Sequence, residues 1–448
     1  MGVVIVGVGP VGLYSAIALA RRGYQVTVID RDPGPRDPQW STRRGVMQFH
    51  HPHFFREQVR EALEAEMPEV WAALLRAGAV PVTTPGPRPE PAGFRCRRAT
   101  FEHHLRRGAE REPGVCLRAG HADRVLRARD RAVGVQVGGY DVPADLVLDA
   151  SGRAGRLTWQ LRRPAEGGDC GRAYVTRQYR LRPGAAEGPT NAPPGLIAWH
   201  RGYLAIAFPH ERRTLSVLIG RPSSDHRLER LRHPAVFDIA AAAIPSLAAW
   251  TDPAVATPIS PVLPGGRLYN SYRGQTGPAG RITPGLIFLG DAVCTTNPAA
   301  GRGVTTSLLQ ARQLVTLLGE HGRDLASCAL AFDVWCERAI KPWFADHVRW
   351  DTDLTRRWAG GDIDLTRPLP SDLIVAAAEA EPALLPAVGP YLSMRALPAS
   401  LQAAEPTARA VYATGWRPPL PPGPDLDDLA DLITAADTAA APATAAPA

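Results

Sequence analysis

Residues 3–30 read VVIVGVGPVGLYSAIALARRGYQVTVID, and this stretch decides the fold. It opens with an apolar run at residues 3–6 that is too short for a helix and is typical of a buried parallel strand. The pattern G-x-G-x-x-G follows at residues 7–12, and residues 13–22 have apolar positions at helical spacing. A second apolar run occupies residues 25–29. A strand, a glycine turn, a helix and a strand in this order predict a βαβ unit.

The glycines of this turn and the acid after the second strand suit a dinucleotide. Gly7 permits the tight turn, Gly9 lets the backbone approach a pyrophosphate, and Gly12 lets the helix pack closely on the strand. Asp30 ends the second strand, where a carboxylate can accept hydrogen bonds from a ribose. The helix N-terminus attracts phosphate charge. The predicted site residues are Gly7, Gly9, Val11, Gly12, Asp30 and Arg31.

Composition places the chain among ordinary globular proteins. Its 448 residues allow two or three domains, and 45% are hydrophobic and 21% charged. The net charge is +7, but Lys341 is the only lysine and the arginines are spread among acids, so nucleic-acid binding is not expected. The six cysteines lack metal spacing, which favours reduced thiols. Without a signal-peptide pattern or a long apolar run, we expect a cytoplasmic protein with no membrane contact.

Three histidines, at positions 50, 51 and 53, suggest a metal site at first sight. Adjacent side chains point apart in regular structure, Pro52 interrupts the segment, and no acid or cysteine stands nearby. We therefore expect no metal. The alternatives are a loop that lines a cofactor or substrate and simple surface histidines.

The rest of the chain changes character twice. Strand patterns with little βα alternation between about 170 and 275 predict an antiparallel sheet domain. A buried strand pattern returns at residues 286–291, followed by a glycine loop and a helix at 304–318. The predicted fold class is α/β, with a Rossmann-like dinucleotide-binding domain (assigned to FAD by the motif below), an inserted antiparallel β-sheet substrate domain and a helical C-terminal region. The expected boundaries are 1–80, 95–165 and 280–325 for the first, 166–279 with a connector at 81–94 for the second, 326–435 for the third, and a disordered tail at 436–448.

A second motif indicates which dinucleotide binds. Asp291 ends the strand at 286–291, where it can accept a hydrogen bond from a ribityl hydroxyl. Residues 297–303 present backbone N–H groups at the start of the following helix, and these donors would stabilise negative charge on a reduced flavin. A nicotinamide cofactor needs neither feature. The two motifs together predict FAD.

Over about residues 3 to 350 the chain resembles the p-hydroxybenzoate-hydroxylase-fold flavoproteins, which are the group A flavin monooxygenases and their relatives. The likeness implies that Arg44 and Arg98 contact the FAD phosphate or ribityl region. It also implies that Pro298, Gly301 and Gly303 lie against the isoalloxazine. The residues that carry it are Gly7, Gly9, Gly12, Asp30, Arg44-Gly45, Arg98, Asp149–Arg153, Gly290-Asp291, Pro298 and Gly301-Arg302-Gly303.

The chain departs from this family at its middle motif. The family usually has Asp immediately before the glycine, and that residue is linked to FAD and NAD(P)H binding. Here Ser151 precedes Gly152, and the acid stands at Asp149. Direct reduction by a nicotinamide and a separate flavin reductase therefore both stay open.

The same fold includes flavin-dependent halogenases, which resemble this chain at both glycine motifs. They carry W-x-W-x-I-P in the substrate sheet, whereas residues 204–209 here read LAIAFP. They also need an early lysine, and Lys341 comes far too late. Halogenation is not expected.

The likeness implies an FAD-dependent monooxygenase, a hydroxylase of secondary metabolite biosynthesis. It would insert one oxygen atom from O2 into a small aromatic or polycyclic substrate through a flavin C4a-hydroperoxide, with NADPH or NADH as transient reductant. Leu204, Ile206 and Phe208 are the candidate substrate pocket. No catalytic side chain is assigned, because the flavin carries the chemistry; a substrate base would come from the sheet domain or from residues 50–53. The alternatives are an FAD-dependent dehydrogenase or ene-reductase and a non-enzymatic binding module.

Overall fold

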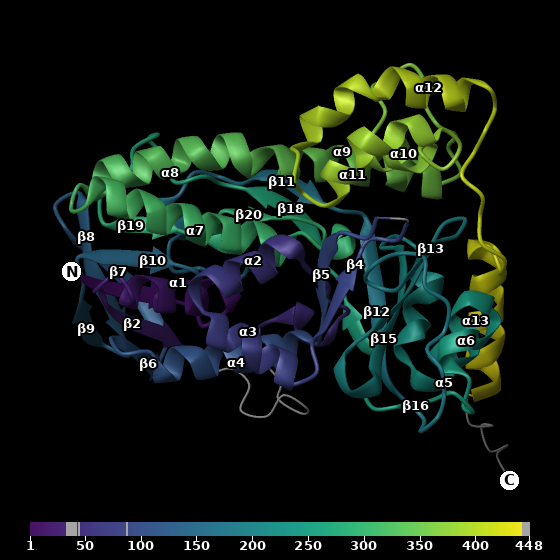
Figure 1. Cartoon of the computed structure of the whole chain (residues 1–448), viewed down its shortest axis with the longest axis horizontal. Coiled ribbons are helices and arrows are strands. Elements are labelled where there is room, and N and C mark those ends of the chain that lie inside the picture. The colour runs from purple at the N-terminus through teal and green to yellow at the C-terminus, as the bar shows by residue number, and fades with distance from the viewer. Residues whose placement is uncertain (33–42, 44, 87, 441–448) are drawn as a thin grey trace, which may run out of the picture.

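The structure, a computed structural model, describes residues 1–32, 43, 45–86 and 88–440 (Figure 1). Its first unit is built on a parallel five-stranded sheet in the order β19-β10-β1-β2-β6. Both faces of this sheet are covered, so β1 is apolar along most of its length. The strands are β1 (Gly2–Val6), β2 (Gln25–Asp30), β6 (Val115–Ala119), β10 (Leu146–Asp149) and β19 (Leu286–Phe288).

Helices and a small sheet form the outer layers of this unit. On one side α1 (Pro10–Ala20) packs against α4 (Arg98–Arg111) and α7 (Gly303–His321), and α2 (Glu57–Glu66) and α3 (Pro68–Arg76) extend this layer. An antiparallel meander contacts β1 and β10 and consists of β7 (Ala122–Ala128), β8 (Arg131–Val137) and β9 (Tyr140–Pro143). The prediction of a Rossmann-like unit is confirmed.

The second unit is an antiparallel sheet in the order β13-β14-β15-β12-β16, with β17 also paired to β12. Alternate residues of its strands face opposite sides. Ala205 and Ala207 belong to the core under the covering helices, and Leu204, Ile206 and Phe208 to a separate apolar cluster. The strands are β12 (Arg172–Leu181), β13 (Leu196–Trp199), β14 (Leu204–Pro209), β15 (Thr214–Pro222), β16 (Ala256–Pro258) and β17 (Leu263–Gly265).

Three helices cover the outer face of this sheet. Two of them, α5 (Pro234–Ala243) and α6 (Pro245–Thr251), are separated at Pro245, which cannot continue the helix before it. The third is α13 (Leu426–Ala440), whose residues Leu429, Ala430 and Ile433 join the core of this sheet. The C-terminal segment thus returns to the sheet unit (Figure 1). We expected a disordered tail at 436–448, but the backbone is helical as far as Ala440, so the prediction was wrong for residues 436–440. Residues 441–448 lie outside the described residues.

Two small sheets differ from the sequence-based expectation. The connector expected at 81–94 includes most of a hairpin of β4 (Val80–Thr83) and β5 (Pro91–Arg95), which β3 (Phe55–Arg56) extends. The strand expected at 267–272 is β18 (Tyr269–Tyr272). It pairs with β11 (Glu166–Asp169) and β20 (Cys294–Thr295) instead of with the large antiparallel sheet.

The third unit is helical and lies above the antiparallel sheet in Figure 1. It begins with α9 (Lys341–Trp358). The preceding helix α8 (Leu325–Ala339) packs on α7, and its buried residues belong to the core of the first unit. The small core of the third unit gathers around Trp343 and Tyr391. The remaining helices are α10 (Ser371–Ala377), α11 (Leu385–Leu392) and α12 (Glu405–Ala413).

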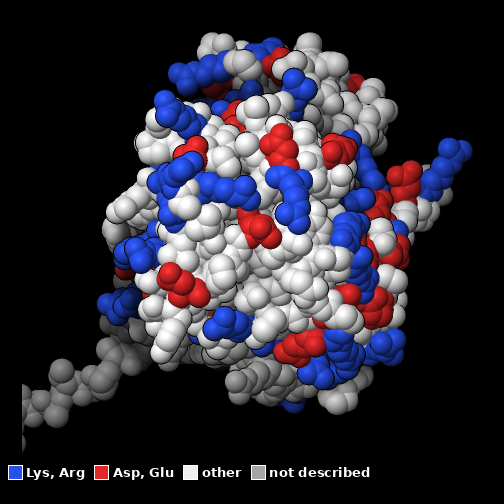
Figure 2. All heavy atoms as spheres, turned by 90° about the vertical axis from the view of Figure 1, so that its left-hand side faces the viewer, with Lys and Arg blue, Asp and Glu red and all other residues white. Residues whose placement is uncertain are grey.

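The surface is charged in a mixed way. On the face seen in Figure 2, blue and red side chains surround a largely uncharged centre. The six cysteines are free thiols, and Cys116 is the exposed one among them. Within the described residues, no helix has the length and apolar character needed to span a bilayer.

Candidate functional site

The glycine turn after β1 leaves space at one glycine and has none at the other two. A Cβ at Gly7, whose φ is +118°, would lie 2.3 Å from the carbonyl oxygen of Ala150. A Cβ at Gly12 would lie 2.0 Å from the carbonyl oxygen of Gly7. At Gly9, the N-cap of α1, a Cβ would meet no heavy atom within 4 Å. The turn therefore has the tight backbone and the open approach that a pyrophosphate requires.

Asp30 lies beside a cavity of about 620 Å³ whose wall also includes Gly7, Gly9 and Arg31. Its carboxylate accepts hydrogen bonds from the backbone N–H of Val8 at 2.9 Å and of Asp32 at 2.8 Å. These bonds fix the carboxylate and leave it acceptor capacity for a ribose hydroxyl. Arg44 lies outside the described residues.

Arg43, which the sequence did not single out, also contacts Asp30. Its guanidinium is buried and donates to Asp30 at 3.2 Å and to Glu102 at 2.6 Å. Burial lowers the pKa of Arg43, but the neighbouring carboxylates outweigh this and raise it. Arg98 pairs with the other oxygen of Glu102. A single buried glutamate thus holds both arginines at this site.

Asp291 lies where two cavities meet. The smaller cavity and a larger one of about 1740 Å³ share wall residues that include Gly9, Arg98, Arg153 and Asp291. The Asp291 side chain is accessible from the cavity, yet the surrounding protein desolvates it and raises its pKa, against the effect of Arg98 and Arg153. Gly9 and Asp291, far apart in the sequence, therefore converge on one continuous space.

The glycine loop, residues 297–303, forms part of the wall of the larger cavity. Gly301 has φ +61°, and a Cβ at Gly301 or Gly303 would meet nothing within 4 Å. Pro298 begins a short turn, and the Asn297 side chain accepts a hydrogen bond from the N–H of Ala299 at 3.1 Å. The loop ends at the first residue of α7, whose N-terminal amides and dipole favour negative charge.

Two buried aspartates of α9 hold this loop in place. Asp351 accepts from the Asn297 amide at 3.0 Å and also binds the Arg172 guanidinium. Asp346 accepts from Arg302 at 2.8 Å and from the Tyr391 hydroxyl at 2.7 Å. The glycine loop is therefore tied to the antiparallel sheet through Arg172 and to the C-terminal helices through Tyr391.

The middle motif, residues 149–153, is held by hydrogen bonds to its own aspartate. Asp149 is buried and accepts hydrogen bonds from the Ser151 hydroxyl at 2.5 Å and from the Thr158 hydroxyl at 2.6 Å. Ser151, which stands where the family usually has Asp, thus donates a hydrogen bond to Asp149, the acid found two positions earlier. Gly152 and Arg153 continue into the shared cavity wall.

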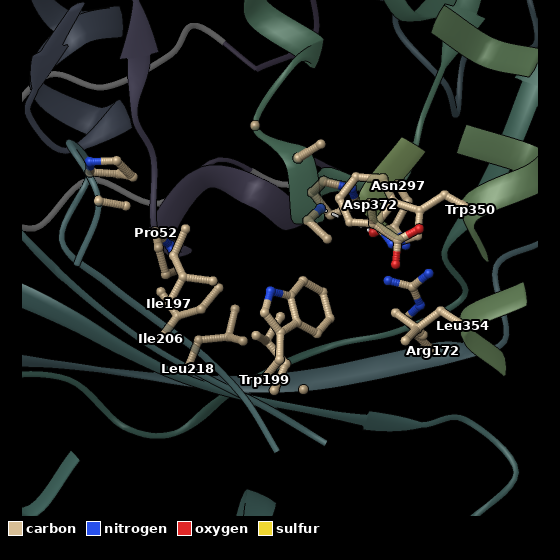
Figure 3. A pocket seen from close by; sticks show the side chains of 18 of the residues that line it. Pro52, Arg172, Ile197, Trp199, Ile206, Leu218, Asn297, Trp350, Leu354 and Asp372 are labelled. Atoms are coloured by element: carbon tan, nitrogen blue, oxygen red, sulfur yellow. Dashed lines mark hydrogen bonds between the residues drawn. The ribbon is translucent and has the colours of Figure 1, made fainter. Parts of the chain in front are cut away.

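The larger cavity has an apolar floor, to which the predicted residues Leu204, Ile206 and Phe208 all contribute. Figure 3 shows aliphatic side chains such as Ile206 and Leu218 on the left, Trp199 near the centre, and a mixed group on the right, which consists of Arg172, Asn297, Trp350, Leu354 and Asp372. The Trp199 ring lies 6.2 Å from that of Trp350 and 6.4 Å from that of Trp358. The sheet and α9 therefore meet through aromatic contacts inside the cavity.

Arg56, in the wall of this cavity, forms no ion pair with a carboxylate of the described residues. Arg56 donates to the carbonyl oxygen of Ala300, in the glycine loop, at 2.7 Å and to that of Leu392 in α11. Burial and the positive charge of Arg302 lower its pKa to about 9. Arg56 thus joins the glycine loop to the C-terminal helices through backbone oxygens.

Two of the three clustered histidines reach the cavity. His51 and His53 contribute to its wall, whereas His50 does not. The Nδ1 atom of His51 lies 2.8 Å from the Thr176 hydroxyl oxygen, and burial lowers the pKa of both cavity histidines to about 3. Over the described part of the chain, no cluster of three or more His, Cys, Asp or Glu is arranged to hold a metal.

The sequence did not reveal Trp199, Trp350, Asn297, Arg56 or the part played by Arg43. Trp350, Leu354 and Trp358 repeat every four residues, so a cavity-facing stripe of a helix was a readable signal. Trp199 lies on β13, which the sequence did not predict as a strand. Arg43 and Arg44 are adjacent arginines, and the sequence gives no basis for deciding which of the two contacts Asp30.

Residues 2–166 match the family model described as DAO, FAD dependent oxidoreductase. The chain therefore contains an FAD-dependent oxidoreductase domain. Its fold is that of the p-hydroxybenzoate-hydroxylase-like FAD-dependent monooxygenases and halogenases, which confirms the resemblance given by the two glycine motifs.

Three similar proteins illustrate this relationship. Protein Rv3254 of Mycobacterium tuberculosis is 26% identical over 435 residues, which cover 85% of this chain and 87% of that protein. PqsL, described as a probable FAD-dependent monooxygenase from Pseudomonas aeruginosa, has a TM-score of 0.60 at 17% identity, covering 80% of this chain and 98% of PqsL. A triple mutant of the flavin-dependent brominase Bmp2 has a TM-score of 0.61 at 16% identity, covering 80% and 90%. The two structures establish likeness of fold.

Proposed function

We propose that this FAD-dependent oxidoreductase is a monooxygenase acting on a small aromatic or polycyclic substrate. One oxygen atom of O2 would enter the substrate and the other would leave as water. Two electrons would come from NADPH or NADH, directly or through a separate reductase, and a proton from solvent. The observation that carries the proposal is that the apolar cavity shares wall residues with the dinucleotide cavity at Gly9 and Asp291.

The residues present fit FAD. The pyrophosphate would lie at Gly9 and the N-terminus of α1, the adenosine ribose at Asp30, and the ribityl chain at Asp291. The isoalloxazine would lie against the glycine loop, with Arg98 between the two cavities. Bound and reduced FAD would supply the activation of O2, which no side chain in the cavity can supply.

The protein's own contribution is to orient the substrate and exclude water. Leu204, Ile206, Phe208 and Leu218 form an apolar surface, and the rings of Trp199 and Trp350 border it (Figure 3). Such a surface suits a flat apolar ring system and shields the reaction from water. The buried aspartates of α9 keep the glycine loop fixed relative to this surface.

The position of the lysine supports oxygen transfer over halogenation. Lys341 pairs with Glu166 at 3.1 Å and with Glu337 at 3.1 Å. It is not part of the wall of either cavity. The chain thus brings no lysine to the place where a halogenase would need one.

The test is product mass with isotopically heavy O2. Purified protein loaded with FAD is incubated with NADPH, or with NADH and a flavin reductase, and a panel of hydroxylated polycyclic aromatics. We expect a product that is heavier by one oxygen atom, carrying the heavy isotope. A substrate that loses two hydrogens without gaining oxygen would support the dehydrogenase alternative instead. Protein that takes up no FAD would contradict both.

A further inference from the structure

His53 has a defined tautomer. Its Nδ1 atom lies 2.9 Å from the backbone carbonyl oxygen of His51. A carbonyl oxygen can only accept a hydrogen bond, so Nδ1 must carry the proton. In a neutral imidazole with a protonated Nδ1, the Nε2 atom is an acceptor. The backbone of the segment therefore fixes which ring nitrogen offers a lone pair.

The imidazole stays neutral in the physiological range. Burial, together with the nearby Arg98, His51 and His210, lowers the pKa of His53 to about 3, against the hydrogen bond to the His51 carbonyl, which raises it. A group with this pKa is a poor proton acceptor, yet it remains a hydrogen-bond acceptor at every pH from about 5 to 8. Its role is to orient a donor and not to store a proton.

The surroundings of the ring leave Nε2 for the cavity. Phe55 stacks on the ring with centroids 6.0 Å apart and an interplanar angle of 25°. His53 is part of the wall of the larger cavity, and no described residue gives its Nε2 a hydrogen bond. Arg98 and Asp291 belong to the wall of the same cavity as His53.

The neighbouring histidines lack this combination. His51 faces a threonine hydroxyl, which can donate or accept, so its tautomer is not fixed. His50 is absent from the cavity wall. Among the three clustered histidines, His53 alone pairs a fixed acceptor with access to the cavity.

We infer that Nε2 of His53 accepts a hydrogen bond from a hydroxyl group on the substrate, so that the substrates are phenols or enols with an extended apolar body. This inference rests on the proposed function, because it concerns the same cavity. An O–H donor satisfies the Nε2 lone pair, and the apolar floor holds the ring system. A bare hydrocarbon or an aryl ether would leave Nε2 without a partner.

Two naphthalene probes distinguish the contribution of the hydroxyl group to binding from that of the ring system. FAD-loaded protein is titrated with 2-naphthol and with 2-methoxynaphthalene, and binding is followed through tryptophan fluorescence and the flavin absorbance spectrum. We expect 2-naphthol to bind about 2- to 10-fold more tightly, the range that one net hydrogen bond supplies. The preference should stay constant from about pH 5 to 8, since His53 remains neutral throughout.

Three variants assign the preference to one atom. His53→Asn keeps a donor near the Nδ1 position and removes the Nε2 acceptor, so the preference for 2-naphthol should disappear. His53→Gln places an amide oxygen near the Nε2 position and should restore part of it. His50→Asn, an equivalent change outside the cavity, should leave it unchanged.

Several results would overturn the inference. Equal affinity of the wild-type protein for the two probes would do so, as would failure to bind either. A preference that survives in His53→Asn while FAD affinity falls would assign the ring to the flavin and not to the substrate. In each case the FAD-loaded protein could still give the oxygenated product, so this failure is distinguishable from failure of the proposed monooxygenase function.

Discussion

The glycine turn and the substrate cavity are built in opposite ways. The turn lies within residues 3–30, and the backbone alone determines it, because a Cβ at Gly7 or Gly12 would collide with a carbonyl oxygen. The cavity draws its walls from β13–β15, α9, the histidine segment and residues 417–421. Side chains from distant segments decide its shape. A fold of this kind can therefore keep its cofactor site while its substrate site changes.

The cofactor site and the substrate cavity join at the glycine loop, residues 297–303. The largest effect is expected from a substitution that releases this loop. Asp346→Ala would leave Arg302 buried without its carboxylate, beside Tyr391. We expect the free energy of unfolding to fall by about 3–5 kcal/mol. Urea unfolding followed by tryptophan fluorescence measures this change.

Asp353→Ala is the matched control for this change. Asp353 lies on the same helix and pairs with Arg356 and Arg357 nearer the surface. Its loss should lower the free energy of unfolding by less than about 1 kcal/mol. Equal effects of the two substitutions would show that the buried pair does not hold the glycine loop.

The next largest effect is a difference in folding stability between alanine substitutions of Gly12 and Gly9, two glycines of the same turn. Gly12→Ala places a methyl group 2.0 Å from the Gly7 carbonyl oxygen, so we expect a loss of about 1–3 kcal/mol of folding stability. Gly9→Ala meets open space, and its φ of −72° suits any residue. Its stability should change by less than about 0.5 kcal/mol, and its FAD affinity should fall at least about tenfold.

Thermal unfolding of the FAD-free proteins and an FAD titration give these two numbers for each variant. We expect Gly12→Ala to lower mainly the folding stability and Gly9→Ala to lower mainly the FAD affinity, because Gly12 supports the fold and Gly9 the ligand. If Gly9→Ala bound FAD as the wild type does, the pyrophosphate would not lie at this turn.

The smallest effect concerns Asp291, at the junction of the two cavities. Because the fold raises the pKa of this carboxyl, the FAD-free protein binds its proton more tightly than the unfolded chain. That contribution to stability is present at low pH and is lost as the pH rises through the raised pKa. Asp291→Asn removes the ionised form, so near pH 7 it should stabilise FAD-free protein, by no more than about 1 kcal/mol since the group keeps access to water.

The same substitution should weaken FAD binding, because an amide is a poorer acceptor than a carboxylate for a ribityl hydroxyl. Melting temperatures at about pH 5 and pH 7, with and without FAD, measure both effects. A variant that is less stable without FAD near pH 7 would show that Asp291 serves the fold and not the cofactor.

The sequence predicted what the backbone determines and missed what distant contacts determine. The glycine turn, Asp30 and Asp291 follow from local patterns, and the structure places them around one continuous space. The strand expected at 286–291 ends earlier, at Phe288, and Asp291 lies in the short turn after it. The candidate pocket residues Leu204, Ile206 and Phe208 all line the larger cavity.

The remaining differences have a long-range cause. The hairpin of β4 and β5 lies in a proline-rich segment whose composition favours a loop, and pairing with β3 overrides that preference. The tail was expected to be disordered from about residue 436, yet α13 continues to Ala440 because its earlier apolar residues pack on the sheet helices. No local pattern reports that a helix so late in the chain belongs to the middle unit.

The central claim is that the turn at Gly9 and the carboxylate of Asp291 hold one FAD above the apolar floor. A crystal structure of the FAD-loaded protein tests it most directly. The account predicts electron density with the pyrophosphate at Gly9, the ribityl chain at Asp291 and the isoalloxazine between the glycine loop and Leu204, Ile206 and Phe208. Density for FAD elsewhere, or with its ring turned away from that floor, would contradict it.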